Sequence, residues 1–435
     1  MWKLGAFRFP LLIIVAWIMV FITRLIPVGG EWVGLDAFTW LTIFIWTVVY
    51  FTAMFLGVTS SVNTSFNLNS WPSKWQNRWI IRLSFFSMLG AILIIYEFAV
   101  IRAYGFSTPV SIIRQMEVAV ASDGFEGSWI SGAGRMLTPA LMVAWVLSAL
   151  NWAELRKNTL IILSLSSSIV FYQQMMFEGG RFFLAALLVM IFLARGFANR
   201  LGLQKSVSII NRMFWIGLFI VVCLLFGYMF IDRYSQTDRI FSEAYETWAA
   251  NFDLEVDDKV SSRLSGSMSG VWLALCMIWA YFTQGINELN SLLLSSPPQP
   301  AWGGFQFSQI AQVLNKITSL DLKYDQLQNL PKIGTYNTLY GASYIDFGHI
   351  GALIFIAAIG WITGKAIRFL QSQRLNGLAI NAPLLITLGV FAPIVSLVVN
   401  LWPAFCWALL VGSVLKLPTH QISPKPTLVS KKYHQ

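Results

Sequence analysis

The amino-acid sequence predicts an all-α polytopic membrane protein in which residues 1–435 form a single membrane domain. The chain is 56% hydrophobic and 11% charged, and its mean hydropathy is +0.64. These values are typical of chains that are solvated by a bilayer. Apolar runs close to the roughly 20 residues that a helix needs to cross the hydrocarbon core recur along the sequence. Basic residues are also distributed unevenly among the segments between these runs.

About ten apolar stretches are candidate transmembrane helices. The sixth is short, and the last two divide a single apolar run near Pro403, because proline ends or kinks a helix. The first stretch is long enough to span and has no A-x-A cleavage site, so we expect no cleaved signal peptide. The predicted spans are residues 9–28, 35–58, 83–101, 136–152, 159–177, 182–195, 213–231, 347–364, 382–398 and 401–416.

The charges of the connecting segments predict the orientation. An even number of spans puts both termini on one side, which then carries 18 of the 30 Lys and Arg but only one acid, Glu154. Because basic segments stay in the cytoplasm, we expect cytoplasmic termini. Topology therefore accounts for the net charge of +10, and no nucleic-acid partner is predicted. The segments on this side are the N-terminus, 74–82, 154–158, 195–212, 365–374 and the C-terminal tail.

Two long segments fall on the external side, residues 102–135 and residues 232–346. Within the second segment, residues 270–294 are apolar over a length that is short for a membrane span. An odd number of spans would also move the basic tail outside, so we predict a re-entrant or interfacial segment here. We find no internal repeat and no linker between separate domains.

The external side favours arginine over lysine. From the N-terminus to Arg263 its basic residues are eight arginines and one lysine, whereas the cytoplasmic set contains nine of each. A guanidinium can bind two phosphate oxygens at once, so this bias favours a polyanionic ligand. The alternative is that these arginines anchor the protein to lipid head groups and pair with external acids. Those near span ends are Arg24, Arg102, Arg135, Arg181 and Arg233.

The turn from Phe177 to Arg181 is the best single candidate for an anion site. Gly179 and Gly180 leave the backbone N–H groups at the start of the sixth span unobstructed, and a helix N-terminus attracts anions. Glu178, in the same turn, is a candidate substrate-binding residue. The alternative is that the two glycines only make a tight turn.

The segment that closes the second external loop carries the candidate catalytic residues. Asp346 could accept a proton from a hydroxyl, or it could simply be the N-cap of the eighth span. His349 falls in the first turn of that span, where a neutral imidazole base is favoured; the alternative is a helix-end histidine bonded to the loop. Tyr336, Asn337 and Tyr344 offer hydroxyl, amide and aromatic groups of the kind that hold sugars, although ordinary loops use them too.

No metal site and no cofactor are predicted. The three cysteines, Cys223, Cys276 and Cys406, lie in apolar runs without metal-ligand spacing. No Asp-x-Asp motif occurs outside the membrane, and the nearest approach to one is Asp257-Asp258.

The order of these motifs resembles a known family. A basic glycine turn precedes a mid-chain span, and Tyr281-Phe-Thr-Gln-Gly-Ile-Asn-Glu-Leu289 lies in the long external loop. Tyr336-Asn-Thr and Tyr344-Ile-Asp-Phe-Gly-His-Ile-Gly351 follow. The chain is thus similar to the oligosaccharide repeat-unit polymerases, the Wzy-type O-antigen polymerases of Gram-negative inner membranes. The likeness covers roughly residues 170–370 in motif and the whole chain in topology.

The resemblance implies a GT-C-like fold in the bacterial inner membrane, with the external loops in the periplasm. It implies a glycosyltransferase that moves a growing glycan from its undecaprenyl diphosphate onto a new lipid-linked repeat. Diphosphate binding would fall to Arg181 and Arg135, and we add Arg102 and Arg233 from the arginine bias. The implied partners are undecaprenyl-diphosphate-linked glycans, membrane lipid and a chain-length regulator.

Three rival functions remain. An O-antigen ligase has the same architecture and differs in its acceptor. A flippase or transporter of lipid-linked sugars would place ionisable residues deep in several spans and repeat its halves, whereas here the spans are nearly free of charge apart from Glu97. A non-catalytic assembly factor would tolerate the loss of single external arginines.

Overall fold

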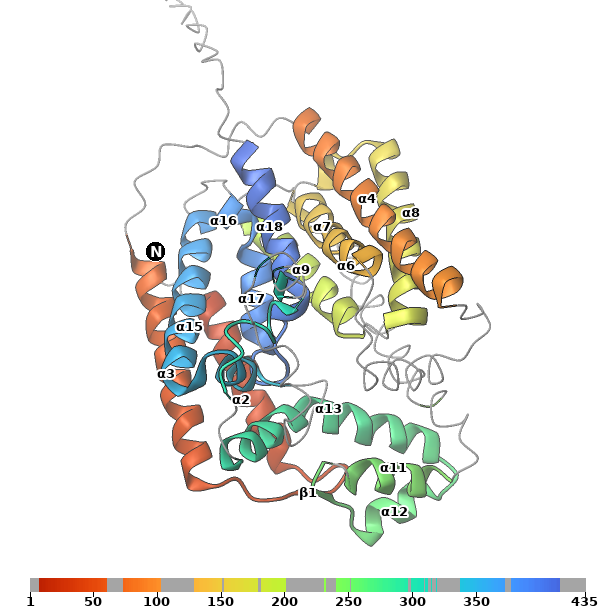
Figure 1. Ribbon diagram of the computed structural model, residues 1–435, viewed down its shortest axis with the longest axis vertical. Coiled ribbons are helices and arrows are strands. Elements are labelled where there is room, and N and C mark those ends of the chain that lie inside the picture. The colour runs from red at the N-terminus through yellow and green to blue at the C-terminus, as the bar shows by residue number, and fades with distance from the viewer. Residues whose placement is uncertain are drawn as a thin grey trace, which may run out of the picture.

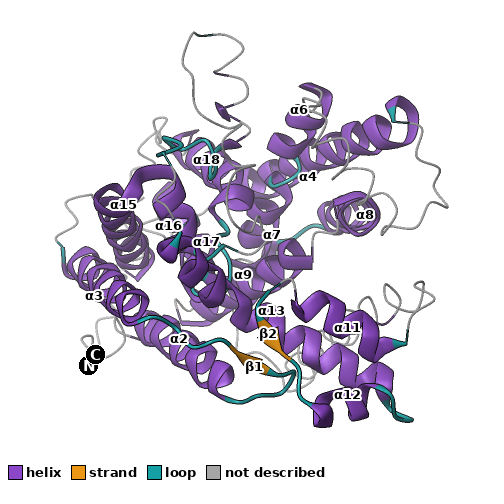
Figure 2. Ribbon diagram, turned by 60° about the horizontal axis from the view of Figure 1, so that its bottom comes forward, coloured by secondary structure: helices purple, strands orange, loops and turns teal. Residues whose placement is uncertain are grey.

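A computed structural model gives the fold (Figures 1 and 2), and most of the predicted spans are helices in it. The residues that the structure describes are 8–60, 73–102, 129–150, 152–178, 181–200, 231, 240–250, 252–295, 299–308, 310–311, 314, 318, 337–371 and 377–414. The predicted span 213–231 lies outside these residues except for Ile231.

The described elements are almost all helices. In chain order they are α2 (Arg8–Leu25), β1 (Glu31–Trp32), α3 (Ala37–Thr59), α4 (Ser73–Tyr96), the π-helical turn η2 (Glu97–Ile101), α6 (Trp129–Leu137), α7 (Ala140–Leu150), the 3₁₀ turn η3 (Trp152–Glu154), α8 (Lys157–Gln173), the π-helical turn η4 (Gln174–Glu178), α9 (Arg181–Arg200), α11 (Phe241–Ala250), β2 (Leu254–Glu255), α12 (Asp258–Leu264), α13 (Ser269–Leu294), α15 (Leu339–Gln371), α16 (Gly377–Ile380), α17 (Ala382–Phe391) and α18 (Val398–Val414).

Five helical stretches in the described part of the chain are long and apolar enough to cross a membrane. They are Ala37–Thr59, Lys74–Ile101, Ile130–Leu150, Ser269–Leu294 and Leu339–Gln371, and shorter apolar helices accompany them. The prediction of a mainly α-helical fold is confirmed, and these helices support the prediction of a multi-pass membrane protein. The number of ten spans stays a prediction.

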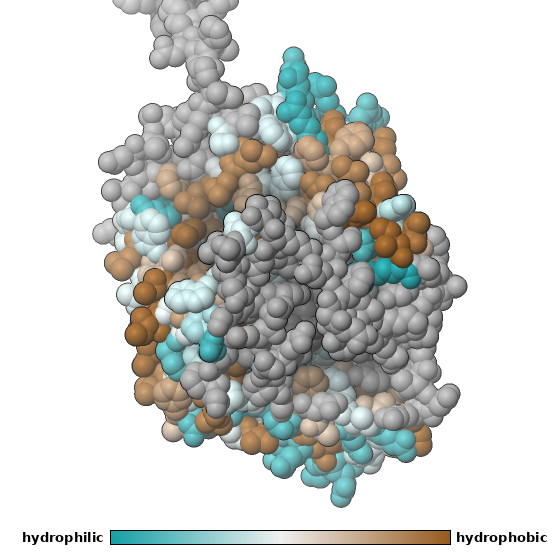
Figure 3. Space-filling view, in the orientation of Figure 1, coloured by the Kyte–Doolittle hydropathy of each residue, from teal (hydrophilic) through white to brown (hydrophobic). Residues whose placement is uncertain are grey.

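Large apolar side chains face outward in rows along several helices. On α3, Leu41, Phe44 and Val48 are 55%, 65% and 47% exposed, and on α15 Ile350 and Ile354 are 77% and 64% exposed. Rows of this kind at helical spacing are typical of a surface that faces lipid or another protein. Figure 3 shows hydrophobic residues gathered mainly on the flanks and hydrophilic residues towards the two ends.

Helices α3 and α15 form the most extensive pair among the described helices. They run in the same direction, since Phe38 contacts His349 near their starts and Gly57 meets Gly364 near their ends. Their backbones touch: a Cβ on Gly364 would overlap the carbonyl oxygen of Met54. Close approach through glycine is a common way of packing helices where lipid removes the hydrophobic driving force.

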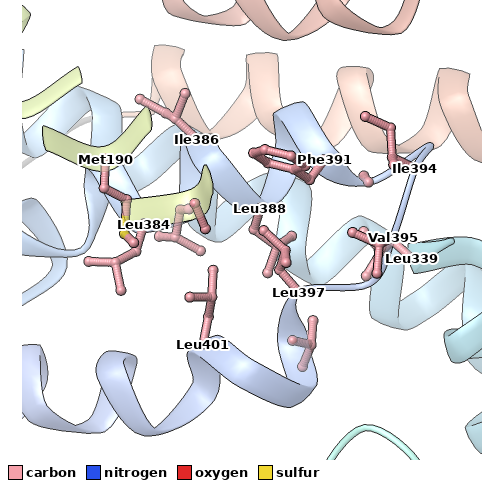
Figure 4. Packing of buried hydrophobic residues seen from close by; sticks show 14 of the residues in the cluster. Met190, Leu339, Leu384, Ile386, Leu388, Phe391, Ile394, Val395, Leu397 and Leu401 are labelled. Carbon is pink, nitrogen blue, oxygen red and sulfur yellow. The ribbon is translucent and has the colours of Figure 1, made fainter. Parts of the chain in front are cut away.

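Helix α17 forms the centre of the bundle and is buried on every side. Figure 4 shows Leu384, Ile386 and Leu388 of α17 packed among side chains from α9 and α18. A helix that is apolar all round belongs in a core rather than at a lipid or water boundary. The loop after α17 then leads back to the start of α15, where Leu339 N–H donates to the Ala392 carbonyl oxygen at 2.9 Å.

Segments that the charge pattern assigned to one side meet at one end of the bundle. Asn77, in segment 74–82, donates to the carbonyl oxygen of Glu154 at 3.1 Å and accepts from the Thr159 hydroxyl at 2.6 Å. The Arg195 guanidinium lies 5.7 Å from the Trp152 ring centroid. These contacts bring together segments 74–82 and 154–158 and the start of 195–212.

The other end of the bundle, here called the loop end, gathers segments predicted to be external. Strand β1 pairs antiparallel with β2, so the connection between α2 and α3 is tied to the 232–346 segment. Helix α13 lies crosswise at this end, beside α11 and α12 (Figure 1). It is a continuous 26-residue helix that is long and apolar enough to cross a membrane, so the expectation that its apolar part is too short for a span was wrong. Its interfacial or re-entrant placement stays a prediction.

Candidate functional site

Asp346 lies at the loop end and holds a neighbouring loop through its carboxylate. The Phe305 N–H donates to Oδ1 at 2.8 Å and the Gln306 N–H donates to Oδ2 at 3.0 Å. The side chain is completely buried. Two charge-assisted bonds from consecutive backbone amides resemble an anion-binding turn in which a carboxylate is the anion.

The loop that Asp346 holds has an unusual backbone. Trp302 has φ +50°, rare for a residue with a Cβ, and Gly303 follows at φ +90°. The Trp302 N–H donates to the Asp346 carbonyl oxygen at 2.8 Å, and the Ala301 N–H donates to that of Ile345 at 3.1 Å. The left-handed turn thus directs four backbone N–H groups of residues 301–306 at residues 345–346.

A kink at Gly348 separates Asp346 from His349. Gly348 has φ 66° and ψ −172°, which interrupts α15. Asp346 therefore lies near the end of the first part of α15 and not at the N-cap position that was one of the two alternatives for it. His349 starts the second part, as expected, and is exposed. Its ring lies 4.5 Å from that of Tyr344 and 5.8 Å from that of Phe38, measured between centroids.

Asn337 and Tyr344 take mainly packing positions. Asn337 is 7% exposed and its carbonyl oxygen accepts from the Ser396 N–H at 2.6 Å. Tyr344 is 3% exposed, with its ring against that of His349. The Ser396 hydroxyl also donates to Gln306 Oε1 at 3.3 Å, so residues 301–306, 337 and 396 form one connected network. These bonds give Asn337 a structural role, and Tyr344 packs on the ring of His349.

Arg102 belongs to a second group of residues, at the end of α4. Its Nε lies 3.2 Å from Oε1 of Glu97, which is completely buried, and its guanidinium lies 5.0 Å from the Phe98 ring centroid. Phe98 in turn lies 5.3 Å from Phe177, in the turn before Arg181. The structure thus brings Arg102 towards the predicted anion site. Figures 1 and 2 place the ends of α4 and α8 and the start of α15 on different flanks of the bundle.

The remaining candidates are placed only in part. Arg135 is exposed in the last turn of α6. Glu178 ends η4 and Arg181 begins α9, but their side chains are outside the described part. Gly179, Gly180, Arg233 and Tyr336 lie outside the described residues altogether. Their predicted roles stay predictions.

The arrangement gives Asp346 and His349 different chemical capacities. A buried carboxylate whose two oxygens already accept backbone N–H groups is suited to hold a loop. An exposed imidazole at a helix start is suited to exchange a proton with a bound group. Sequence reasoning missed Gln306, which is 0% exposed, because nothing in a polar loop shows which glutamine will be buried.

We expect Asp346→Asn to lower the melting temperature of the purified protein in detergent, and Asp346→Ala to lower it further. An asparagine must turn its NH₂ towards one of two N–H donors, and a buried donor left unpaired costs about 1–3 kcal/mol. Asp36→Asn is the matched control, because Asp36 accepts one N–H, from Phe38 at 2.8 Å, and asparagine caps equally well. An Asp346→Asn protein that is as stable as wild type but inactive would instead support a role as base.

Comparison with known proteins gives no assignment: no family model matches the chain, and no curated protein and no solved structure matches it either.

Proposed function

We propose that this protein polymerises undecaprenyl-diphosphate-linked oligosaccharide repeat units, as an O-antigen polymerase of a bacterial inner membrane. In this proposal the chain has ten spans, a GT-C-like fold and cytoplasmic termini, and the loop end faces the periplasm. The growing glycan leaves its lipid diphosphate and is joined to a new lipid-linked repeat. A chain-length regulator in the same membrane is the proposed protein partner.

One observation carries most of the proposal. An exposed histidine, His349, stands at the start of a helix with lipid-facing side chains, beside a loop fixed by Asp346. A base at that level can meet a hydrophilic glycan whose lipid carrier stays in the bilayer. The apolar flanks of the bundle supply the surface along which such a carrier would approach.

The proposed reaction is a single displacement at the anomeric carbon of the donor. The acceptor hydroxyl loses its proton to a ring nitrogen of His349, and its oxygen forms the new bond to that carbon. The bond from the carbon to the diphosphate oxygen breaks, and its electron pair leaves with the lipid diphosphate. Attack from the opposite face inverts the anomeric configuration.

The leaving diphosphate needs fixed positive charge and hydrogen-bond donors, because these stabilise the negative charge that develops on its oxygen. Arg181 and the backbone N–H groups of Gly179 and Gly180 take this role in the proposal. Arg135, Arg102 and Arg233 extend the positive surface. Glu97 partly neutralises Arg102, so we expect Arg102 to contribute less than Arg181.

The test is the lipopolysaccharide banding pattern of cells that lack this gene and are complemented with the wild-type gene. We expect the ladder to collapse to core plus one repeat without the gene and to return with it. Loss of every repeat, including the first, would point to a ligase or a flippase instead. An unchanged ladder would remove the protein from this pathway.

A further inference from the structure

Gln284, in the middle of α13, is a buried side chain whose hydrogen bonds are missing. It is 1% exposed, and neither its amide nitrogen nor its amide oxygen has a hydrogen-bond partner among the described residues. Among the side chains that the structure describes it stands apart in having both polar atoms unpaired. Native proteins seldom bury such groups, and each instance calls for a water, an ion or a ligand.

Three other polar side chains on the same helix, those of Thr283, Asn287 and Asn290, are paired. Thr283 accepts from the Trp32 indole N–H at 2.8 Å, and Asn290 accepts from the Asp36 N–H at 3.0 Å. Asn287 accepts from Arg24 Nη2 at 3.1 Å and donates to the Phe252 carbonyl oxygen at 3.3 Å. These contacts already attach α13 to α2, to the α2–α3 connection and to Phe252 just before β2, so Gln284 is not needed for that attachment.

Arg24 adds a second unpaired group close to Gln284. Its Nη2 is bonded to Asn287 and to the Val33 carbonyl oxygen, whereas its Nη1 is buried and has no partner among the described residues. Asn287 follows Gln284 by three positions on α13, and residues three apart are neighbours on a helix surface. The guanidinium with the unpaired nitrogen is therefore bonded to a residue about one helical turn along α13 from the unpaired amide of Gln284.

We propose that Gln284 and Arg24 form a subsite for a sugar unit that carries hydroxyl or acetamido groups. This inference rests on the proposed function and identifies where the lipid-linked glycan is held. The unpaired set contains donors, on Arg24 and on the Gln284 amide nitrogen, together with one acceptor, the Gln284 amide oxygen. A phosphate would satisfy the donors but leave that oxygen unpaired, so the ligand must also donate a hydrogen bond. Sugar hydroxyl and acetamido groups both accept and donate.

The test uses Gln284→Leu, which removes both polar atoms and keeps a similar volume. We expect the variant to be at least as stable as wild type, because a buried unpaired amide is replaced by an apolar group. In the same cells we expect about a tenfold fall in chain extension, corresponding to one lost pair of ligand hydrogen bonds. The readouts are the melting temperature of the purified protein and the density of long-chain bands at matched protein level.

Gln76→Leu is the matched control at the opposite end of the bundle. Gln76 is also completely buried, but its Nε2 donates to the Leu147 carbonyl oxygen at 2.7 Å. We expect this substitution to lower the melting temperature and to leave chain extension per folded molecule unchanged. The same substitution is therefore expected to have opposite effects at the two glutamines. Gln284→Leu should reduce chain extension without a loss of stability, whereas Gln76→Leu should reduce stability without a loss of chain extension per folded molecule.

A binding measurement separates a sugar from a lipid head group. Full-length protein in nanodiscs is heated with lipid-linked single repeats extracted from cells lacking the gene, or with undecaprenyl phosphate. We expect the lipid-linked repeats to raise the melting temperature of wild type substantially more than that of Gln284→Leu. An equal rise for both proteins, or a rise with undecaprenyl phosphate that Gln284→Leu loses, would overturn the subsite.

The outcomes for the subsite and for the function are distinct. If the deletion strain loses its ladder and Gln284→Leu restores it fully, the subsite is wrong and the polymerase proposal stands. If Gln284→Leu lowers both the melting temperature and the density of long-chain bands, the glutamine has a structural role and the subsite is again wrong. A deletion strain with a normal ladder overturns the polymerase proposal itself.

Discussion

Replacing Arg181 by alanine is expected to reduce the lipopolysaccharide ladder to core plus a single repeat. Removing one preorganised donor from a developing oxyanion typically slows a reaction about 10²–10³-fold, which is enough to abolish long chains. Arg181→Lys is expected to fail nearly as badly, because lysine keeps the charge but lacks the planar fork that binds two phosphate oxygens. The measurement is the band pattern at matched protein level in cells lacking the chromosomal gene.

Arg78→Ala is the control for the loss of one arginine charge. Arg78 is exposed near the start of α4, at the end of the bundle opposite the loop end. We expect cells carrying Arg78→Ala to show a normal ladder of lipopolysaccharide bands. A normal ladder from Arg181→Ala would remove the diphosphate role assigned to Arg181, while the polymerase proposal would then depend on the other external arginines. A loss in both variants would indicate a general effect of surface charge.

Gly364→Ala is expected to cause a large loss of stability. The added Cβ would overlap the carbonyl oxygen of Met54, which is backbone and cannot turn away. The helices α3 and α15 would have to move apart, and overpacking of this kind costs about 1–3 kcal/mol. A lower melting temperature in detergent and less protein in the membrane fraction are the expected readouts.

The same glycine-to-alanine change at Gly196 is expected not to destabilise the protein. Gly196 lies inside α9, and no described atom lies within 4 Å of the Cβ that it would gain. Alanine is a better helix former than glycine by about 1 kcal/mol, so we expect this variant to be as stable as wild type or more stable. If Gly364→Ala is equally well tolerated, the close approach of α3 and α15 is not a feature of the folded protein.

Much of the helical fold could be predicted from apolar runs and from charge. The predicted spans 35–58 and 159–177 correspond closely to α3 and to α8 with η4. Charge assigned segments 74–82 and 154–158 to one side, and Asn77 indeed contacts Glu154. These predictions succeed because burial in lipid and the positive-inside rule act on each segment largely by itself.

The candidate site could be predicted only in part. The sequence identified Asp346 and His349 as special, but it could not show that residues 301–306 return to hold Asp346. Nor could it distinguish Gln284 from its paired neighbours on α13. Both features depend on contacts between segments that are far apart in the chain, and no local pattern specifies such contacts. Gly348 is a glycine among several, and its φ of 66° becomes visible only in the structure.

The pairing of β1 with β2 has a consequence for biosynthesis. At synthesis rates of about 5–20 residues per second, roughly 10–45 s separate the emergence of these two strands from the ribosome. A still longer time separates the synthesis of α3 from that of α15, its main packing partner. During this time the inward faces of α2 and α3 are exposed in the bilayer without their final neighbours. The nascent chain therefore depends on the insertion machinery or on lipid to shield those faces, and a chain that stops before α15 would lack the contacts that give α3 a fixed place.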